Sequence, residues 1–136
     1  MKGRCQINKP KIRPKTRKRP WQRNEEHRAF VRKMNCAMKG RHKYCEERPC
    51  EFAHVRKGSD GAMGRKPSDR YGVPLCVPCH RRQHQIGETR FWAKIDADPL
   101  DLAAKLWALS RKYEGGDLLY RGAYAIRQWR ETAQHH

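Results

Sequence analysis

The chain lacks a long hydrophobic run. Only 37% of its 136 residues are hydrophobic, which is below the usual share for a soluble domain. No apolar stretch approaches the ~20 residues that span a bilayer. The amino-terminal sequence MKGRCQINKPKIRPK also has no apolar segment of the kind that forms a secretory signal. From these absences we expect a cytoplasmic protein.

Acidic residues are scarce as well. The chain has 32 Lys and Arg residues against 14 Asp and Glu residues, which gives a formal net charge of +18. Ten of the basic side chains and none of the acidic ones fall in residues 1–24. Such an excess predicts a polyanionic partner, for which we expect DNA, with RNA as the alternative.

The first 24 residues are expected to form a disordered, basic nucleic-acid-binding arm. Pro10, Pro14 and Pro20 interrupt any helix, and no apolar periodicity indicates a strand. Cations between prolines can neutralise phosphates without reading base edges, and an aromatic side chain can stack on a base. A merely solubilising tail is the alternative. The residues predicted to bind nucleic acid are Lys11, Arg13, Lys15, Arg17, Lys18, Arg19 and Trp21.

The rest of the chain predicts an α+β fold in two parts, residues 25–90 and a helical extension over residues 91–136 that packs on them. In the first part we expect a helix to about residue 34, a cysteine-containing loop (36–50), a strand (50–54), a glycine-rich loop (57–69), a second strand (71–75), a tight turn (76–79) and a helix that starts at the second cysteine of that turn (79–86). In the second part, Asp98-Pro99 begins a helix that Gly115-Gly116 ends, and a last amphipathic helix covers about 117–132.

The six cysteines predict a zinc site, because a reducing compartment disfavours disulfides. Cys76-x-x-Cys79 places two thiolates on one turn, which is half of a tetrahedral zinc site. Cys36 with Cys45 or Cys50 supplies the other half. We favour Cys45, because Cys50 falls on the predicted strand and is expected in the core. The alternative is that all are buried or incidental thiols.

Three histidines predict a second metal site. His80 and His84 stand one turn apart on one face of the predicted helix, so both can bind one divalent ion. His54 ends the first strand and could face the same point, either as a third ligand or as a base that activates water. Alternatively, His84 is solvated, His80 replaces a cysteine at the zinc and His54 is an ordinary strand residue.

The segment AHVRKGSDGAMGRKPSDRYGVPLCVPCHRRQH contains CxxCHxxxH after a strand that ends in histidine. It resembles the zinc-containing HNH (ββα-metal finger) nucleases, particularly the phage-associated branch that includes recombination-enhancement (Ref-like) nucleases. The resemblance covers about residues 26–110. It implies a ββα-metal core in residues 25–90 with a structural zinc knuckle and flanking helices. It also implies metal-dependent hydrolysis of DNA phosphodiester bonds in phage recombination or DNA processing, with a recombinase or another phage DNA-processing protein as a further partner.

The resemblance also implies roles for single residues. His54 becomes the general base, and His80 and His84 become ligands of a catalytic Mg²⁺, Mn²⁺ or other divalent ion. The four cysteines hold a separate structural Zn²⁺.

Two positions depart from the family pattern. Ala53 stands where members often have His or Asp, and Tyr71 stands where they have Asn. One metal ligand and the residue that orients the base are therefore unassigned. Asp69 is the nearest candidate for one of these roles, although an ordinary turn residue would look the same.

The glycine-rich loop offers further phosphate contacts. Its glycines permit close backbone approach to a ligand, and Lys57, Arg65 and Lys66 are predicted to meet phosphates beside the proposed active site. Two rival functions remain open at this point. One is a non-catalytic zinc-knuckle nucleic-acid-binding accessory protein, in which Ala53 and Tyr71 mark a decayed active site. The other is an interaction protein that engages a partner through helix 99–113.

Overall fold

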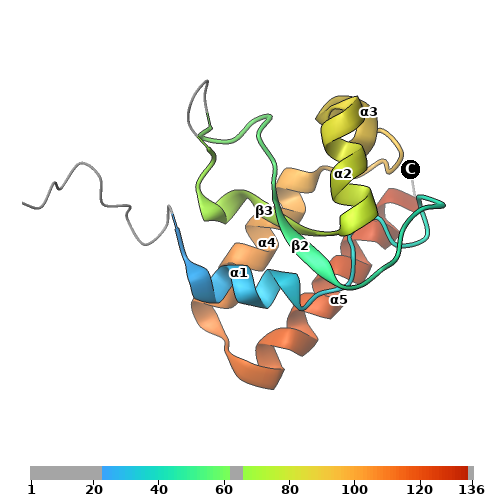
Figure 1. Cartoon of the computed structure of the whole chain (residues 1–136). Coiled ribbons are helices and arrows are strands. Elements are labelled where there is room, and N and C mark those ends of the chain that lie inside the picture. Colours follow the sequence, from blue (N-terminus) through green and yellow to red (C-terminus); the bar gives the residue numbers. More distant parts are fainter. Residues whose placement is uncertain (1–22, 62–65, 135–136) are drawn as a thin grey trace, which may run out of the picture.

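A computed structural model describes residues 23–61 and 66–134. The predicted arm residues Lys11, Arg13, Lys15, Arg17, Lys18, Arg19 and Trp21, and Arg65 of the loop, lie outside the described residues. The fold is α+β, as predicted (Figure 1). Its elements are α1 (Glu25–Arg32), β2 (Cys50–His54), the short 3-10 helix η3 (Asp69–Tyr71), β3 (Gly72–Cys76), α2 (Val77–Ile86), α3 (Glu88–Trp92), α4 (Pro99–Lys112) and α5 (Gly115–Gln134).

The two strands form one antiparallel hairpin. In its register Cys50 lies opposite Cys76, and His54 lies opposite Gly72. The second strand begins one residue later than predicted, because residue 71 ends the 3-10 helix η3. The Phe52 ring occupies the space beside Gly72, where a Cβ atom would lie 1.9 Å from the Cζ atom of that ring. Gly72 is therefore needed so that Phe52 can cross the hairpin next to His54.

Helix α2 follows β3 without a separate turn, which corrects the prediction for residues 76–79. Cys76 is the N-cap of the helix, and Pro78 lies in its first turn. A proline is tolerated there because the first N–H groups of a helix have no intrahelical acceptor. Cys79, His80 and His84 consequently all belong to one helix, which ends at Gly87, a residue with a φ of 88°.

Helices α1 and α4 begin at side-chain caps. The Asn24 side chain accepts a hydrogen bond from the backbone N–H of His27, and the Asp98 side chain accepts one from Leu100. Helix α1 ends at residue 32 rather than near residue 34. The predicted end of α4 is also wrong. Helix α4 stops at Lys112, and Gly115 begins α5 instead of terminating α4.

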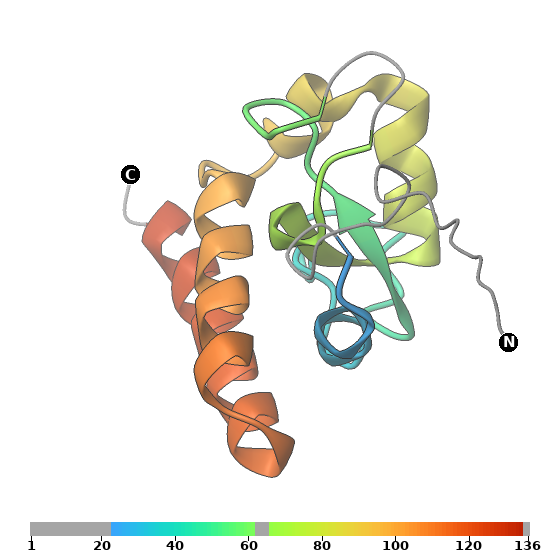
Figure 2. The ribbon, with the colours of Figure 1, turned by 90° about the vertical axis from the view of Figure 1, so that its left-hand side faces the viewer.

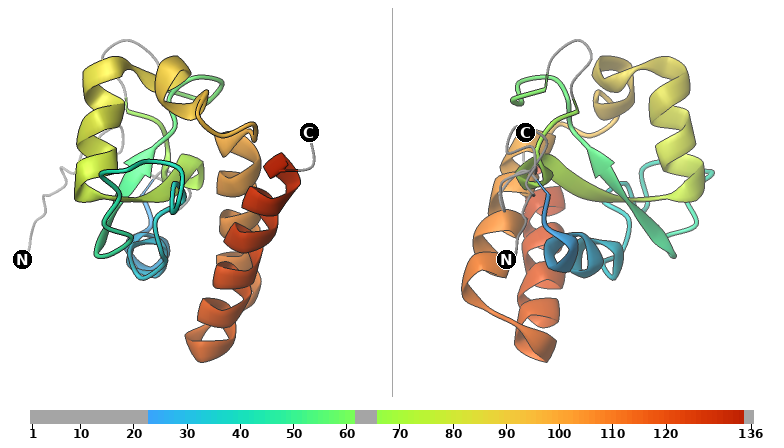
Figure 3. Two further views of the ribbon diagram at one scale, coloured as in Figure 1. Left: turned by 90° about the vertical axis from the view of Figure 1, so that its right-hand side faces the viewer. Right: turned by 60° about the vertical axis from the view of Figure 1, so that its left-hand side comes forward.

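Helices α4 and α5 form an antiparallel pair that lies beside the hairpin and α1, on the side away from α2 (Figures 2 and 3). Helix α5 approaches α1 closely at Gly122, where a Cβ atom would lie 2.7 Å from the Phe30 ring and 2.8 Å from the sulfur of Met34. The indole N–H of Trp129 donates to the carbonyl of Asp98 at 2.8 Å, which ties the end of α5 to the start of α4. One hydrophobic core thus spans the hairpin and all the long helices.

Helix α3 was not predicted from the sequence. Its five residues bury Phe91 and Trp92 in the core, and Gly87 separates it from α2. None of the helices among the described residues is long and apolar enough to cross a membrane.

Candidate metal centre and histidine pocket

Four cysteine sulfurs, those of Cys36, Cys45, Cys76 and Cys79, lie within 4.8 Å of one another. Cys36 follows α1, and Cys45 lies in the loop before β2. Cys76 ends β3 as the N-cap of α2, and Cys79 lies in the first turn of that helix. Three of the side chains are buried and Cys45 is half-buried. The structure therefore brings together the set that sequence spacing favoured, and these four thiols can hold a metal ion such as zinc.

Backbone amides support this cluster. The N–H of Met38 points to the sulfur of Cys36 at 3.4 Å, and the N–H of Glu46 points to the sulfur of Cys76 at 3.3 Å. Cys50 is buried next to the cluster, but its thiol donates to the carbonyl of Glu47 at 3.3 Å. Cys50 is therefore outside the set of four, as its place on β2 suggested.

The thiol pKa values indicate a donor set suited to a cation. The neighbouring thiols of Cys50 and Cys79 lower the pKa of Cys36 despite its burial. The nearby Cys36 sulfur in turn raises the pKa of Cys50 and Cys79, and burial raises the pKa of Cys45. A negative charge on one sulfur therefore disfavours a second negative charge on its neighbours. A Zn²⁺ ion compensates four thiolates together, which fits this arrangement.

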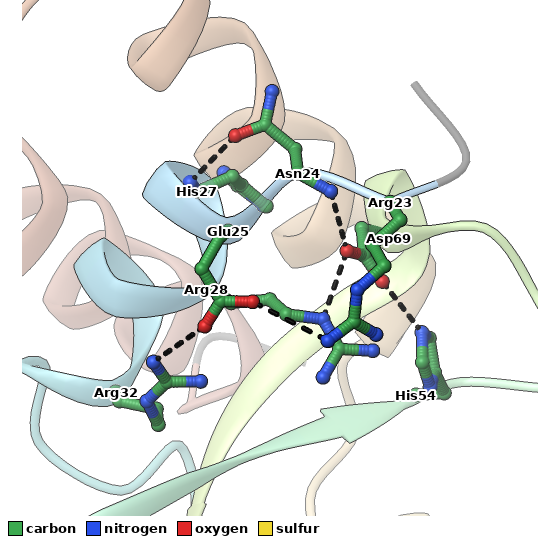
Figure 4. A network of polar contacts seen from close by, with 8 residues as sticks. All are labelled: Arg23, Asn24, Glu25, His27, Arg28, Arg32, His54 and Asp69. Atoms are coloured by element: carbon green, nitrogen blue, oxygen red, sulfur yellow. Dashed lines mark hydrogen bonds and ion pairs between the residues drawn. The ribbon is translucent and has the colours of Figure 1, made fainter. Parts of the chain in front are cut away.

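The second cluster centres on His54 and Asp69 (Figure 4). The Nε2 atom of His54 lies 3.1 Å from Oδ1 of Asp69. The other carboxylate oxygen accepts from the Nε atom of Arg28 at 2.8 Å and from the backbone N–H of Asn24 at 2.7 Å. The Asp69 side chain is only 1% exposed, and it is held between the start of α1, through Asn24 and Arg28, and the end of β2, through His54.

The charge state of Asp69 defines the histidine tautomer. Burial would raise the pKa of the Asp69 carboxyl, but hydrogen bonds from His54, Arg28 and Asn24 outweigh it and hold the pKa well below its usual range. A carboxylate can only accept hydrogen bonds, so Nε2 of His54 carries the proton. In the neutral imidazole, the Nδ1 atom of His54 consequently keeps its lone pair.

His54, His80 and His84 line one pocket of about 420 Å³. The rings of His80 and His84 have centroids 4.9 Å apart, as expected for residues one turn apart on α2. The Nδ1 atom of His80 lies 2.8 Å from Oε1 of Glu51, which leaves Nε2 of His80 as its ligand atom. Sequence reasoning missed Glu51, because no spacing rule connects positions 51 and 80.

Cations line the same pocket. Arg28 of α1, Arg56 after β2 and Lys66 at the end of the glycine-rich loop all contribute to its walls. Lys57, predicted to contact phosphates here, lies elsewhere: its Nζ atom is 3.2 Å from Oγ1 of Thr89, and it does not line the pocket. Arg28 and Arg56 carried no sequence signal beyond their charge.

Glu88 fixes the backbone that leads away from His54. Its two carboxylate oxygens accept from the backbone N–H of Arg56 at 2.7 Å and of Lys57 at 3.0 Å. Glu88 begins α3, the helix that the sequence did not predict, which explains why this contact was not anticipated either.

The two departures from the family pattern lie outside the pocket. Ala53 is fully buried in the core. Tyr71 does not line the pocket, and its carbonyl accepts from the backbone N–H of Val55 at 2.8 Å. The residue that contacts His54 is Asp69, and not Ala53 or Tyr71.

The two clusters differ in their number of close ligands. Within the described part of the chain, the four cysteines are the one group of three or more potential ligands close enough to hold a metal ion. The histidine pair is therefore a more open arrangement than the cysteine cluster.

No family model, curated protein or solved structure matches this chain. The chemistry of the two sites therefore carries the functional conclusion.

Proposed function

We propose that the protein is a metal-dependent endonuclease of the HNH type, which hydrolyses phosphodiester bonds of DNA. One observation carries this proposal: a histidine held by a buried carboxylate shares a pocket with a histidine pair on the helix that follows the hairpin. The order β2, β3, α2 agrees with the ββα-metal finger that the sequence resembles. Such a core unites a base, two metal ligands and phosphate-binding cations at one place.

In the proposed reaction His54 acts as the general base. Its Nδ1 lone pair accepts a proton from water as the water oxygen attacks the phosphorus atom. The bond from phosphorus to the 3′ oxygen breaks, and the leaving oxygen takes a proton from solvent. Asp69 is a positioning residue, because it touches His54 and not the substrate. It holds the ring in the required tautomer and stabilises the imidazolium that forms.

His80 and His84 are the proposed ligands of a catalytic divalent ion, with Mg²⁺ and Mn²⁺ as the leading candidates. Such an ion stabilises the charge that develops on the phosphate and on the leaving oxygen. With His80 and His84 as its protein ligands, the ion would remain accessible to water and to a phosphate oxygen. Arg28, Arg56 and Lys66 add positive charge at the walls of the pocket, where phosphate oxygens would bind.

The cysteine cluster has a different role in this proposal. Its four cysteines would hold a Zn²⁺ ion with four protein ligands, which is the number typical of structural zinc, whereas catalytic zinc sites keep a position open for water or substrate. The resemblance to phage-associated HNH nucleases further suggests a role in recombination or DNA processing.

A non-catalytic nucleic-acid-binding accessory protein is the second candidate. The open ligand arrangement of the histidine pocket favours it, since Ala53 and Tyr71 supply no third ligand there. This protein would bind DNA through the same cations without cleaving it.

The test is cleavage of plasmid DNA by purified protein with Mg²⁺ or Mn²⁺. His54→Ala should abolish nicking and leave the zinc content and DNA binding unchanged, since general-base catalysis contributes about 10²–10⁴-fold. His42→Ala is the matched control, because His42 does not line the pocket. Equal cleavage by His54→Ala would remove His54 from the mechanism. DNA binding by wild-type protein without cleavage in any divalent metal would favour the accessory protein.

A further inference from the structure

A second groove, of about 550 Å³, lies between the end of α1, the loop before β2 and α5. None of the described residues that line it is acidic. Its cations come from three separate segments of the chain and share only this location. They are Arg32, Lys33, Lys39, Arg48, Arg127 and Arg130.

Most of these cations are available to a ligand. Lys33 and Arg127 are exposed and form no salt bridge with the described residues. Arg32 pairs with Glu25 at 3.2 Å on the protein surface, as Figure 4 shows, and Lys39 pairs with Glu47 at 3.5 Å.

These two surface pairs are weak and easily exchanged for a phosphate. Arg130 is different, because it donates to the carbonyls of Cys36 and Ala37 and holds α5 to the cysteine loop. Arg130 therefore has a structural role in the groove, and the other cations supply the positive charge that a ligand would meet.

Two exposed tyrosines directly follow groove-lining residues of α5: Tyr120 follows Leu119, and Tyr124 follows Ala123. Tyr120 is 73% exposed and Tyr124 is 48% exposed, and they stand one turn apart on α5. Arg127 follows Tyr124 by three residues, so all three lie on one face of the helix. Aromatic faces beside cations are the usual means of binding unpaired nucleic acid, because successive bases stack on the rings while the cations contact the phosphates. A duplex offers no free base faces for such stacking.

The groove and the histidine pocket lie at the two ends of the α1–β2 pair. Arg28 lines the pocket and Arg32 lines the groove, one turn apart on α1. Arg48 lies two residues before β2 and lines the groove, and His54 ends β2 and lines the pocket; the five-residue strand between them spans about 13 Å.

We infer that this groove binds an unpaired strand of nucleic acid, whose phosphates contact Lys33 and Arg127 and whose bases stack on Tyr120 and Tyr124. The inference that the same strand continues into the histidine pocket rests on the proposed nuclease function. The substrate class is then DNA that is single-stranded near the cleavage site, such as a flap, tail or junction.

The test compares fluorescence anisotropy of labelled oligonucleotides of about 20 nucleotides, single-stranded and duplex, across salt concentrations. The full chain carries His54→Ala, so that no cleavage occurs. One variant combines Tyr120→Ala with Tyr124→Ala, and a second combines Lys33→Gln with Arg127→Gln. Lys94→Gln with Lys105→Gln is the matched control, because both lysines are exposed and line neither site. Circular dichroism checks the fold of each variant.

The tyrosine variant should weaken single-strand binding about fivefold or more per residue, with duplex binding unchanged. The charge variant should weaken it about tenfold and reduce the slope of log K against log salt by about 1.4, the value for two phosphate contacts on a single strand. Unchanged single-strand binding by either variant would overturn the inference. Equal losses on duplex and single strand would overturn the assignment to an unpaired strand.

This outcome is separable from the nuclease hypothesis. Binding is measured on a chain without the proposed base, so a wild-type protein that cleaves nothing leaves the groove result valid. Conversely, a wild-type protein that cleaves DNA while the groove variants bind like the control would overturn the groove alone.

Discussion

The cysteine cluster and the histidine pocket both take residues from α2, and Cys79 and His80 are adjacent in the chain. The two sites differ in how completely their side chains could surround a metal ion. The cysteine sulfurs lie within 4.8 Å of one another and are largely buried. The histidine rings line an open pocket of about 420 Å³, and each of two rings is held from behind by a carboxylate.

This difference assigns the two sites different roles: the cysteine cluster stabilises the fold, and the histidine pocket is the place for chemistry. A closed set of four ligands binds a metal in the folded state only, so metal affinity becomes folding free energy. An open site leaves room for water and a phosphate, and its fixed elements are the groups behind the histidines. We therefore expect substitutions in the cysteine cluster to change the fold, and substitutions behind the histidines to change activity or metal affinity.

The largest effect is expected from Cys76→Ser. Structural zinc binding is worth about 10–16 kcal/mol, which is comparable with the whole free energy of unfolding of a small domain. Loss of one ligand should release the zinc and unfold the region around the cysteine loop. Zinc content by mass spectrometry of the native protein and circular dichroism check this outcome.

Cys50→Ala is the matched control for that substitution. Cys50 is 6% exposed and lies beside the cluster, yet its sulfur is outside the set of four. The variant should keep its zinc and lose only a modest part of its stability. If Cys76→Ser stays folded without zinc, or if Cys50→Ala loses the metal, the assignment of ligands is incorrect.

A smaller effect, on activity more than on the fold, is expected from Asp69→Asn. The amide can present its N–H₂ group to His54 and favour the wrong tautomer, so we expect about a 10²-fold or greater loss of cleavage rate with zinc and fold retained. Plasmid nicking at saturating Mg²⁺ measures the rate. A cleavage rate equal to wild type would show that His54 needs no partner.

Asp69 also makes stability depend on pH. Its pKa is lowered in the folded protein, so its contribution is complete above the ordinary carboxyl pKa and is lost as pH falls below about 4. The stability gap between wild type and Asp69→Asn should therefore narrow as the pH is lowered through this range. Denaturant unfolding at several pH values measures it, with Asp96→Asn, at an exposed position, as the control. A gap independent of pH would contradict the lowered pKa.

Local patterns explain which parts of the site were predictable. Two pairs of ligands are close in the chain: Cys76 lies three residues before Cys79, and His80 lies four residues before His84. Each separation is about one helical turn, so the spacing alone places the members of each pair together. The choice of Cys45 over Cys50 followed from the alternation of strand residues. The caps Asn24 and Asp98 likewise identified two helices from local chemistry.

The remaining features depend on packing between distant segments. Arg28 reaches Asp69 across 41 positions, and Glu51 reaches His80 across 29. The start of α2 was misplaced because the CxxC segment was interpreted as a turn, whereas its proline suits a first helical turn. The groove beside α5 needs three separate segments to meet, and the close packing at Gly122 lets α5 approach α1.

The smallest effect is expected from Glu51→Gln. The Glu51 carboxylate accepts from Nδ1 of His80 and so presents Nε2 to a metal. Carboxylates in this position are worth about 10–100-fold in metal affinity or activity. Half-saturation of cleavage should therefore shift to about 10-fold higher Mg²⁺ or Mn²⁺, with the maximal rate nearly restored at high metal concentration.

Recovery at high metal concentration distinguishes Glu51 from Asp69. Loss of a group that orients the base lowers the maximal rate, and added metal cannot restore it. Loss of a group that orients a ligand weakens metal binding, and mass action can compensate for that. Glu26→Gln is the control, because Glu26 is an exposed carboxylate outside the pocket. A Glu51→Gln protein with a lowered maximal rate and unchanged metal dependence would place Glu51 with the base rather than with the metal.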